Sequence, residues 1–181
     1  NDLARSYSLE PEKAIPLHRQ AIDLAPEDPM LWYNFGYSLR ARGLWDEAEQ
    51  AFAESLRLDP SNRRLQLAHD AFLFMRHLKR GETLAAAHEW QKAILELERA
   101  IGLIPLDAAP AYRALGVALH GQGHSKQAIE ALRQAIVKRC DDPQSHLYLA
   151  KVLLVQQHPF HALAHARAAR SMGASRREVS P

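Results

Sequence analysis

The sequence predicts an all-α solenoid built from antiparallel helix hairpins. First, alanine and leucine dominate the composition and β-branched residues are few, which favours helix over strand. Second, the stretch from Met30 to Pro60 contains two amphipathic helices separated by a glycine turn. Third, small residues that mark fixed places in such a hairpin recur along the chain at a nearly constant interval. Together these observations indicate a stack of similar helical units.

The stretch from Met30 to Pro60 defines one hairpin and its register. Pro29 suits the first turn of a helix, and Gly43 ends that helix just after two basic residues. The first helix carries its packing face at three- and four-residue steps: Trp32, Phe35, Gly36 and Leu39. Acidic residues then open a second helix, which ends at Asp59-Pro60. Its buried face is predicted to be Ala48, Phe52, Ser55 and Leu56.

Two sets of small residues keep this register along the chain. The early small residue of each second helix recurs at intervals of 34, 45, 35 and 34 residues: Ala14, Ala48, Ala93, Ala128 and Ala162. A later small residue keeps the same intervals: Ala21, Ser55, Ala100, Ala135 and Ala169. Three intervals lie within one residue of 34 and the fourth carries 11 extra, so the sequence contains an internal repeat with one insertion.

The hairpin at residues 29–62 resembles the sequence pattern of the tetratricopeptide repeat family. The residues that match this pattern, in the family's order, are Trp32, Phe35-Gly36, Leu39, Ala48, Phe52, Ser55 and Pro60. The resemblance implies a right-handed superhelix whose first helices line a concave face. It divides the chain, as one domain, into units in the following order. Residues 1–28 are a partial repeat, 29–62 a regular repeat, 63–108 a lengthened hairpin, 109–142 and 143–176 two further regular repeats, and 177–181 a tail. In the partial repeat we expect a second helix from Glu12 to Leu24, preceded at Asp2–Ser8 by the end of its partner.

The lengthened hairpin admits two registers. Its 11 extra residues amount to about three helical turns, and Ser61-Asn62 supplies a helix cap at its start. In one register Gly81 lies inside a long first helix that spans about 62–87. In the other Gly81 is the turn, so that the first helix gains about one turn and the second about two. A mid-helix glycine costs only about 1 kcal/mol. We favour the turn, because Glu82 follows Gly81 and would begin the next helix, while four basic residues precede Gly81 and would cap the first helix. These basic residues are Arg76, His77, Lys79 and Arg80.

Composition excludes several classes of function. The net charge is only +2, which gives no electrostatic case for nucleic acid, and no apolar run is long enough to insert into a membrane. The single cysteine, Cys140, excludes an internal disulfide and favours a reducing compartment such as the cytoplasm. No phosphate loop, nucleophile elbow or other enzymatic motif occurs, so we expect neither catalysis nor a cofactor.

The candidate binding residues follow from the resemblance, which places them on the concave face of the first helices. They are Tyr33, Asn34, Tyr37 and Arg40; Arg113, Val117 and His120; and Leu147 and Lys151, with Tyr148 beside them. Tyrosine combines apolar area with a hydrogen bond, and arginine pairs with carboxylates. We therefore expect a protein or extended peptide with acidic residues as the partner, contacted by Tyr33, Tyr37, Arg40 and Arg113 as one patch. The alternative is that Tyr33, Tyr37 and Arg40 only cover neighbouring helices. The residues do not match the carboxylate clamp of chaperone-binding relatives.

Two further surfaces have structural explanations that we prefer. In the lengthened hairpin, one apolar stripe comprises Leu67, Ala71, Phe74 and Leu78, and an adjacent stripe comprises Leu65, Ala68, Phe72 and Met75. A helix that is apolar over so wide an arc is usually buried, although it could also bind a partner.

His161 and His165 have a spacing that can chelate a metal, with His158 one turn earlier. A structural site needs four ligands, so we interpret them as surface histidines.

The sequence therefore predicts a non-catalytic scaffold that binds a partner in its concave groove. A second hypothesis is an accessory domain of a larger enzyme, such as a glycosyl- or sulfotransferase. A third is a self-associating scaffold, because repeat stacks need polar caps and neither end of this sequence shows one, which would leave uncapped ends open to a second copy.

Overall fold

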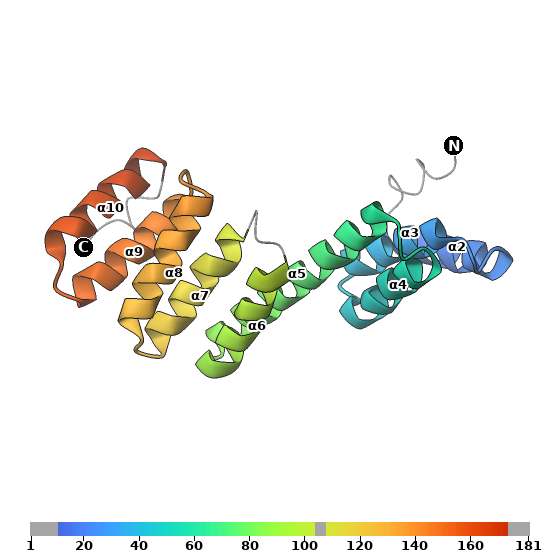
Figure 1. The fold of residues 1–181 in the computed structure, drawn as a ribbon, viewed down its shortest axis with the longest axis horizontal. Coiled ribbons are helices and arrows are strands. Elements are labelled where there is room, and N and C mark those ends of the chain that lie inside the picture. Colours follow the sequence, from blue (N-terminus) through green and yellow to red (C-terminus); the bar gives the residue numbers. More distant parts are fainter. Residues whose placement is uncertain (1–10, 104–107, 174–181) are drawn as a thin grey trace. The chain divides into compact units, whose positions relative to one another are not determined.

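The computed structural model describes residues 11–103 and 108–173, and every regular element in these ranges is an α-helix (Figure 1). The all-α prediction is confirmed. The helices are α2 (Pro11–Leu24), α3 (Pro29–Ala41), α4 (Trp45–Leu58), α5 (Arg63–Ala86), α6 (Trp90–Leu103), α7 (Ala109–Gly121), α8 (Ser125–Lys138), α9 (Pro143–Val155) and α10 (Pro159–Ser171). The predicted helix at Glu12–Leu24 corresponds to α2, whereas Asp2–Ser8 and the tail at 177–181 lie outside the described residues.

The chain divides into two compact units, Asn1–Leu73 and Phe74–Pro181, where the sequence predicted one domain. Unit 1 contains α2, α3, α4 and the first half of α5, and unit 2 contains the second half of α5 and the helices α6 to α10. Within the units, first helices pack against the second helices that follow them, as α3 does on α4, α7 on α8 and α9 on α10. Here α3, α5, α7 and α9 are called first helices, and α4, α6, α8 and α10 second helices.

The core of unit 1 is built around Phe52 of α4. Its ring centroid lies 5.0 Å from that of Phe72 in α5 and 5.2 Å from that of Tyr37 in α3. Leu65, Ala68 and Phe72 are buried, so the predicted stripe of α5 is core over these positions, whereas Met75 of the same stripe and Leu67 of the adjacent stripe are exposed. The start of α3 is fixed by Asp28, whose side chain accepts a hydrogen bond from the backbone N–H of Met30 at 2.8 Å.

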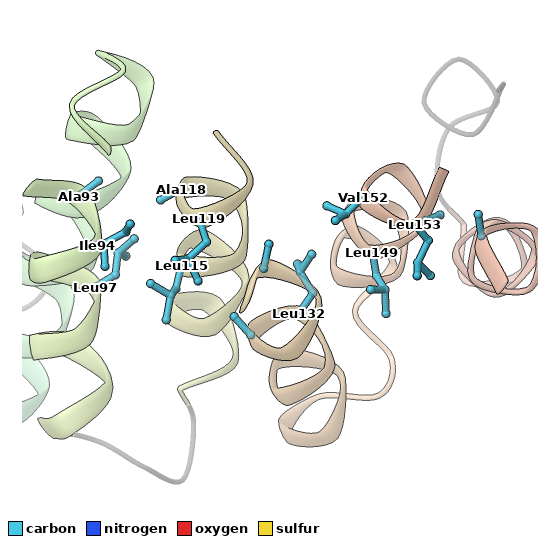
Figure 2. Packing of buried hydrophobic residues seen from close by; sticks show 14 residues of the cluster. Ala93, Ile94, Leu97, Leu115, Ala118, Leu119, Leu132, Leu149, Val152 and Leu153 are labelled. Carbon is cyan, nitrogen blue, oxygen red and sulfur yellow. The ribbon is translucent and has the colours of Figure 1, made fainter. Parts of the chain in front are cut away.

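The core of unit 2 is a continuous apolar layer that runs from α6 to α10 (Figure 2). Leu97, Leu132 and Leu149 are fully buried and belong to α6, α8 and α9. Figure 2 shows Leu97 and Leu115 directed toward each other from α6 and α7. The repeat of large and small residues in the sequence therefore encodes one interlocking layer, in which α7 also contacts α9.

The prediction that Gly81 forms a turn is wrong, because α5 continues as one helix from Arg63 to Ala86. A Cβ atom on Gly81 would lie 2.6 Å from Cγ of Leu97, so the glycine permits a close approach of α6. The turn lies seven residues later at His88, whose φ is 60°. Gly43 and Gly123 take the equivalent turn position with positive φ. Histidine at this position hid the turn in the sequence.

All the extra residues of this segment lie in α5. This helix has 24 residues against 13 in α3, whereas its partner α6 has 14 residues, the same as α4. The prediction that both helices lengthen is therefore wrong, and the long helix considered as the alternative is correct. The predicted cap at its start is confirmed, since Oδ1 of Asn62 accepts from the backbone N–H of Arg64 at 3.1 Å. Leu78, Leu84 and Ala85 of the same helix pack against the core of unit 2.

We predict that Gly81→Ala lowers the free energy of unfolding. The added methyl group collides with a fully buried leucine, and overpacking of this kind costs about 1–3 kcal/mol. Better helix propensity offsets about 1 kcal/mol of this, so a net loss of about 1 kcal/mol is expected. Urea unfolding followed by circular dichroism measures it. The control is Gly102→Ala in α6, where no atom of a neighbouring element among the described residues lies within 4 Å of the new methyl group and stability should not fall. Equal stability of the two variants would contradict the close contact.

Candidate functional site

A groove of about 460 Å³ lies on the first helices of unit 2. It is lined by Glu82, Ala85 and Ala86 of α5, Trp90 of α6, Arg113, Ala114 and Val117 of α7, and Gln144 and Tyr148 of α9. The three alanines keep side-chain bulk off the groove walls, and the two aromatic residues supply apolar surface. The predicted residues Arg113, Val117 and Tyr148 come together here.

Arg113 is held by an ion pair inside unit 2. Its NH1 donates to Oδ2 of Asp142 at 2.7 Å, and Asp142 also accepts from Oγ of Ser145 at 2.6 Å and from the backbone N–H of Gln144. Burial acts to raise the pKa of Asp142, but these hydrogen bonds and the charge of Arg113 outweigh it and hold that pKa below its ordinary value. Because Asp142 is the N-cap of α9, the pair ties α7 to the start of α9.

The two other predicted residues on α9 differ in accessibility. Leu147 is only 4 % exposed and belongs to the core, so we do not include it in the binding surface. Lys151 is exposed, and its Nζ lies 5.4 Å from the centroid of the Tyr148 ring. The two residues therefore place a positive charge beside the aromatic wall of the groove.

His120 does not line the groove. Its Nδ1 is buried and, among the described residues, has no hydrogen-bond partner. The neighbouring Gly121 is covered by the ring of Trp90, whose Cη2 would lie 2.7 Å from a Cβ at that position. The end of α7 is thus packed against the start of α6, and Trp90 joins this packing to the lining of the groove.

In unit 1 the predicted residues form an aromatic cluster with arginines. The rings of Tyr33 and Tyr37 lie 4.9 Å apart, and their hydroxyl oxygens lie 3.4 Å apart. Arg40 stacks over Tyr37, and Arg64 stacks over Tyr33 at 5.2 Å. Tyr33 and Asn34 are buried, at 7 % and 4 % exposure. The expected four-residue patch is distributed over both units, since Arg113 belongs to unit 2.

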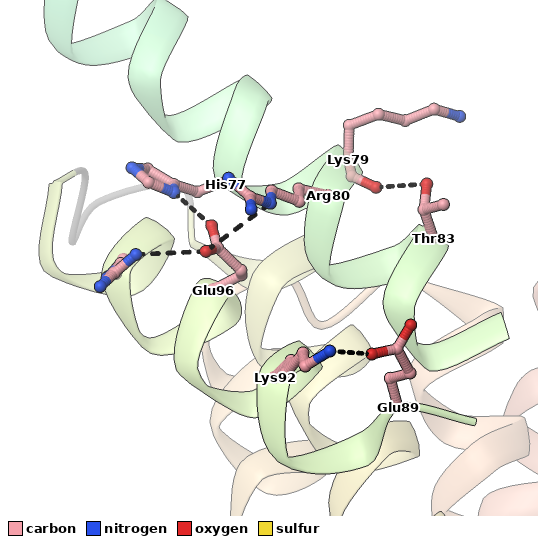
Figure 3. A network of polar contacts seen from close by, with 8 residues as sticks. His77, Lys79, Arg80, Thr83, Glu89, Lys92 and Glu96 are labelled. Carbon is pink, nitrogen blue, oxygen red and sulfur yellow. Dashed lines mark hydrogen bonds and ion pairs between the residues drawn. The ribbon is translucent and has the colours of Figure 1, made fainter. Parts of the chain in front are cut away.

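A buried carboxylate fixes α5 against α6 (Figure 3). Oε2 of Glu96 lies 2.7 Å from Nδ1 of His77, and its other oxygen lies 3.8 Å from Arg80 and 3.2 Å from Arg99. Burial acts to raise the pKa of Glu96, but the hydrogen bond from His77 and the positive charges around it outweigh that effect and lower it. The basic residues that we interpreted as a cap thus include two partners of a buried glutamate.

The histidines of the last hairpin pair across its two helices. Nδ1 of His165 in α10 lies 3.0 Å from Nδ1 of His146 in α9, and His161 contacts His158 rather than joining them. Burial, with the nearby charges of His146, Arg133 and His161, lowers the pKa of His165. Across residues 11–103 and 108–173, no three His, Cys, Asp or Glu side chains are grouped to hold a metal ion.

Sequence reasoning missed six lining residues: Glu82, Ala85, Ala86, Trp90, Ala114 and Gln144. Glu82 follows Gly81 as Val117 follows Gly116 and Tyr37 follows Gly36. The signal was therefore present, and the wrong register of Gly81 concealed it.

Helix hairpins with small residues at their contacts, and a groove on the first helices, define a helical-repeat protein. The family model described as "Tetratricopeptide repeat" matches residues 3–63 and 113–176, so the chain belongs to the tetratricopeptide repeat family. The match omits the segment that contains most of α5 and α6. Members of this family are commonly non-catalytic scaffolds for protein–protein interaction.

Solved structures share the fold. MamA from Desulfovibrio magneticus is 22 % identical, with a TM-score of 0.54 over 90 % of this chain and 85 % of that one. YrrB, a tetratricopeptide repeat protein with an unusual peptide-binding site, is 17 % identical, with a TM-score of 0.54 over 94 % of this chain and 81 % of YrrB. PilF from Pseudomonas aeruginosa is 16 % identical, with a TM-score of 0.56 over 93 % of this chain and 72 % of PilF. No curated protein sequence matches the chain. Among the described helices, none has the length and apolar character that a membrane crossing requires.

We predict that Arg113→Gln destabilises unit 2 by about 1–3 kcal/mol near neutral pH, because Asp142 loses a charged partner while it stays largely buried. The folded-state pKa of Asp142 is lowered, so its contribution is present above the ordinary value of 3.8 and is lost as the pH falls below it. The stability difference from wild type should therefore shrink as the pH falls from about 7 toward about 3.

Urea unfolding across this pH range measures that difference, and Arg167→Gln, an exposed arginine of α10, is the control. A difference that stays constant across the range would show that the guanidinium does not act through the Asp142 carboxylate.

Proposed function

We propose that the chain is a non-catalytic scaffold that binds an extended peptide segment of a partner protein in the groove of unit 2. The lining of this groove is the observation that supports the proposal most directly. Ala85, Ala86 and Ala114 leave room for a peptide backbone. Trp90, Val117 and Tyr148 offer apolar and aromatic area to its side chains, which is the usual make-up of a peptide-binding surface.

The groove is built to keep its shape when it is empty. The Arg113–Asp142 pair fixes α7 to the start of α9, and the Glu96 cluster fixes the second half of α5 to α6. Preorganisation of this kind lowers the entropy that binding must overcome. It also changes the expected partner: Arg113 is neutralised by Asp142, so the argument for an acidic peptide no longer applies to this groove.

We predict that filling the groove abolishes peptide capture. Ala86 is exposed on its wall, so Ala86→Trp should obstruct the groove without disturbing the core. Peptides selected on the wild-type chain from a displayed random library should bind this variant at least about tenfold more weakly, a loss of about 1.4 kcal/mol. Ala53→Trp, at an exposed position of α4 in unit 1, is the matched control. The two tryptophan variants are compared by fluorescence anisotropy after circular dichroism has shown equal helicity. Equal peptide affinity of both variants would remove the groove from the binding site.

A second candidate function is self-association, which the last hairpin supports. Phe160 is 86 % exposed and Val155 is 62 % exposed, and Leu163 on the same helix as Phe160 is half exposed. Exposed large apolar side chains of this kind are typical of an interface with a second copy of the chain.

We predict that Phe160→Asp weakens self-association, because a carboxylate would have to be desolvated in the interface. The weight-average mass, measured by light scattering or analytical ultracentrifugation over a range of concentrations, should rise for the wild-type chain and stay near that of a monomer for the variant. Val137→Asp in α8, at a position 75 % exposed, is the control and should behave as wild type. A wild-type chain that stays monomeric at high concentration would contradict this second function.

A further inference from the structure

Two charged residues line the groove of unit 2, Arg113 and Glu82. Arg113 and Asp142 form a close pair in which each side chain neutralises the other. Glu82 lies on the opposite wall, on α5, and its side chain is exposed. Within the described residues, no hydrogen bond or ion pair engages the Glu82 carboxylate. Among the described residues, Glu82 is therefore the charged lining residue whose carboxylate has no ion-pair partner, while Lys151 places a positive charge beside Tyr148 on α9.

The surroundings of Glu82 leave its carboxylate accessible. Ala85 and Ala86 follow it by three and four residues on α5, so no large side chain stands beside it on the groove side of the next helical turn. The basic neighbours on α5 are engaged or directed elsewhere. Arg80 contacts Glu96, and Figure 3 shows the Lys79 side chain extended away from that cluster. Lys79 forms no ion pair with Glu82 in the part of the chain that the structure describes.

The remaining walls suit a cation as well. Trp90 and Tyr148 line the same groove, and aromatic faces attract ammonium and guanidinium groups. Lys151 stacks on Tyr148, and Trp90 lines the α5–α6 side of the groove, where its ring also covers Gly121 and lies 5.0 Å from the ring of His88. A carboxylate and an indole in one groove are the groups that recognise a lysine or arginine side chain.

We propose that this groove selects peptide segments that carry a lysine or arginine, and that Glu82 is the residue that reads this positive charge. The inference rests on the proposed function, since it names the kind of segment that the groove binds. Ala114 and Val117 on α7 take a small apolar residue of the same segment, which leaves the basic side chain directed to α5. An acidic segment is disfavoured, because it would bring a second negative charge next to Glu82.

The test uses three pools of fluorescein-labelled random octapeptides that are identical except at one fixed position, which holds Arg, Gln or Glu. Their affinities for the full chain are measured by fluorescence anisotropy at low salt. Wild type should prefer the Arg pool to the Glu pool by about fivefold or more, and added salt should reduce the preference. Glu82→Gln should bring the ratio close to one, and Glu82→Arg should reverse it. Glu98→Gln is the matched control, since Glu98 is an exposed glutamate of α6 outside the groove.

The outcomes separate this inference from the proposed function. If Ala86→Trp abolishes binding of every pool while Glu82→Gln keeps the wild-type preference, the groove binds peptide but Glu82 does not select it. If Ala86→Trp leaves all pools bound as before, the groove is not the peptide site and both proposals fail. The same holds if no pool binds the wild-type chain. A preference for the Glu pool that survives Glu82→Gln would overturn the charge assignment directly.

Discussion

In unit 2, α6 approaches α5 so closely that no side chain fits between Gly81 and Leu97. The other features of this unit depend on that contact. It fixes Gly81 as the small residue of a first helix, in the same relation that Gly116 has to Leu132. It therefore sets which residues of α5 face the groove and which face α6. Glu82 reaches the groove because it directly follows Gly81. His77 reaches Glu96 because it lies one helical turn before Gly81. A shift of α5 by one residue would remove both contacts, since helical faces change by about 100° per residue.

The helical architecture could be predicted from the sequence because it depends on local patterns. Pro29, Gly43 and Asp59-Pro60 mark boundaries that the structure confirms to within a residue or two. The error at Gly81 has a physical origin. Glycine serves helices in two ways, as a left-handed turn residue and as a space for a close neighbour, and a sequence does not distinguish them. Here the second role applies, while His88 takes the left-handed conformation that histidine adopts only occasionally.

The binding residues were harder to predict than the helices, because their roles depend on partners distant in the sequence. Arg113 was correctly placed on the inner face, but its engagement with Asp142, 29 residues away, could not be inferred from spacing. Leu147 occupies the same repeat position as Arg113 and is buried, since neighbouring helices cover it. Position in a repeat thus predicts direction, whereas the packing of neighbouring helices decides exposure. Which charges of the groove remain available to a ligand therefore depends on these ion pairs, and a count of the charged lining residues does not give it.

Helix α5 is continuous in geometry but belongs to two cores, and this has a consequence for the hydrogen exchange of its amides. Leu65 and Phe72 are stabilised by unit 1, and Leu78 and Leu84 by unit 2. A helical segment of a dozen residues is marginal by itself in water. When one unit opens, the half of α5 that it supported loses its protection, while the other half remains folded. Amides before and after Leu73 should therefore exchange with two different opening free energies, and the helix records the separate stability of each unit along a single element.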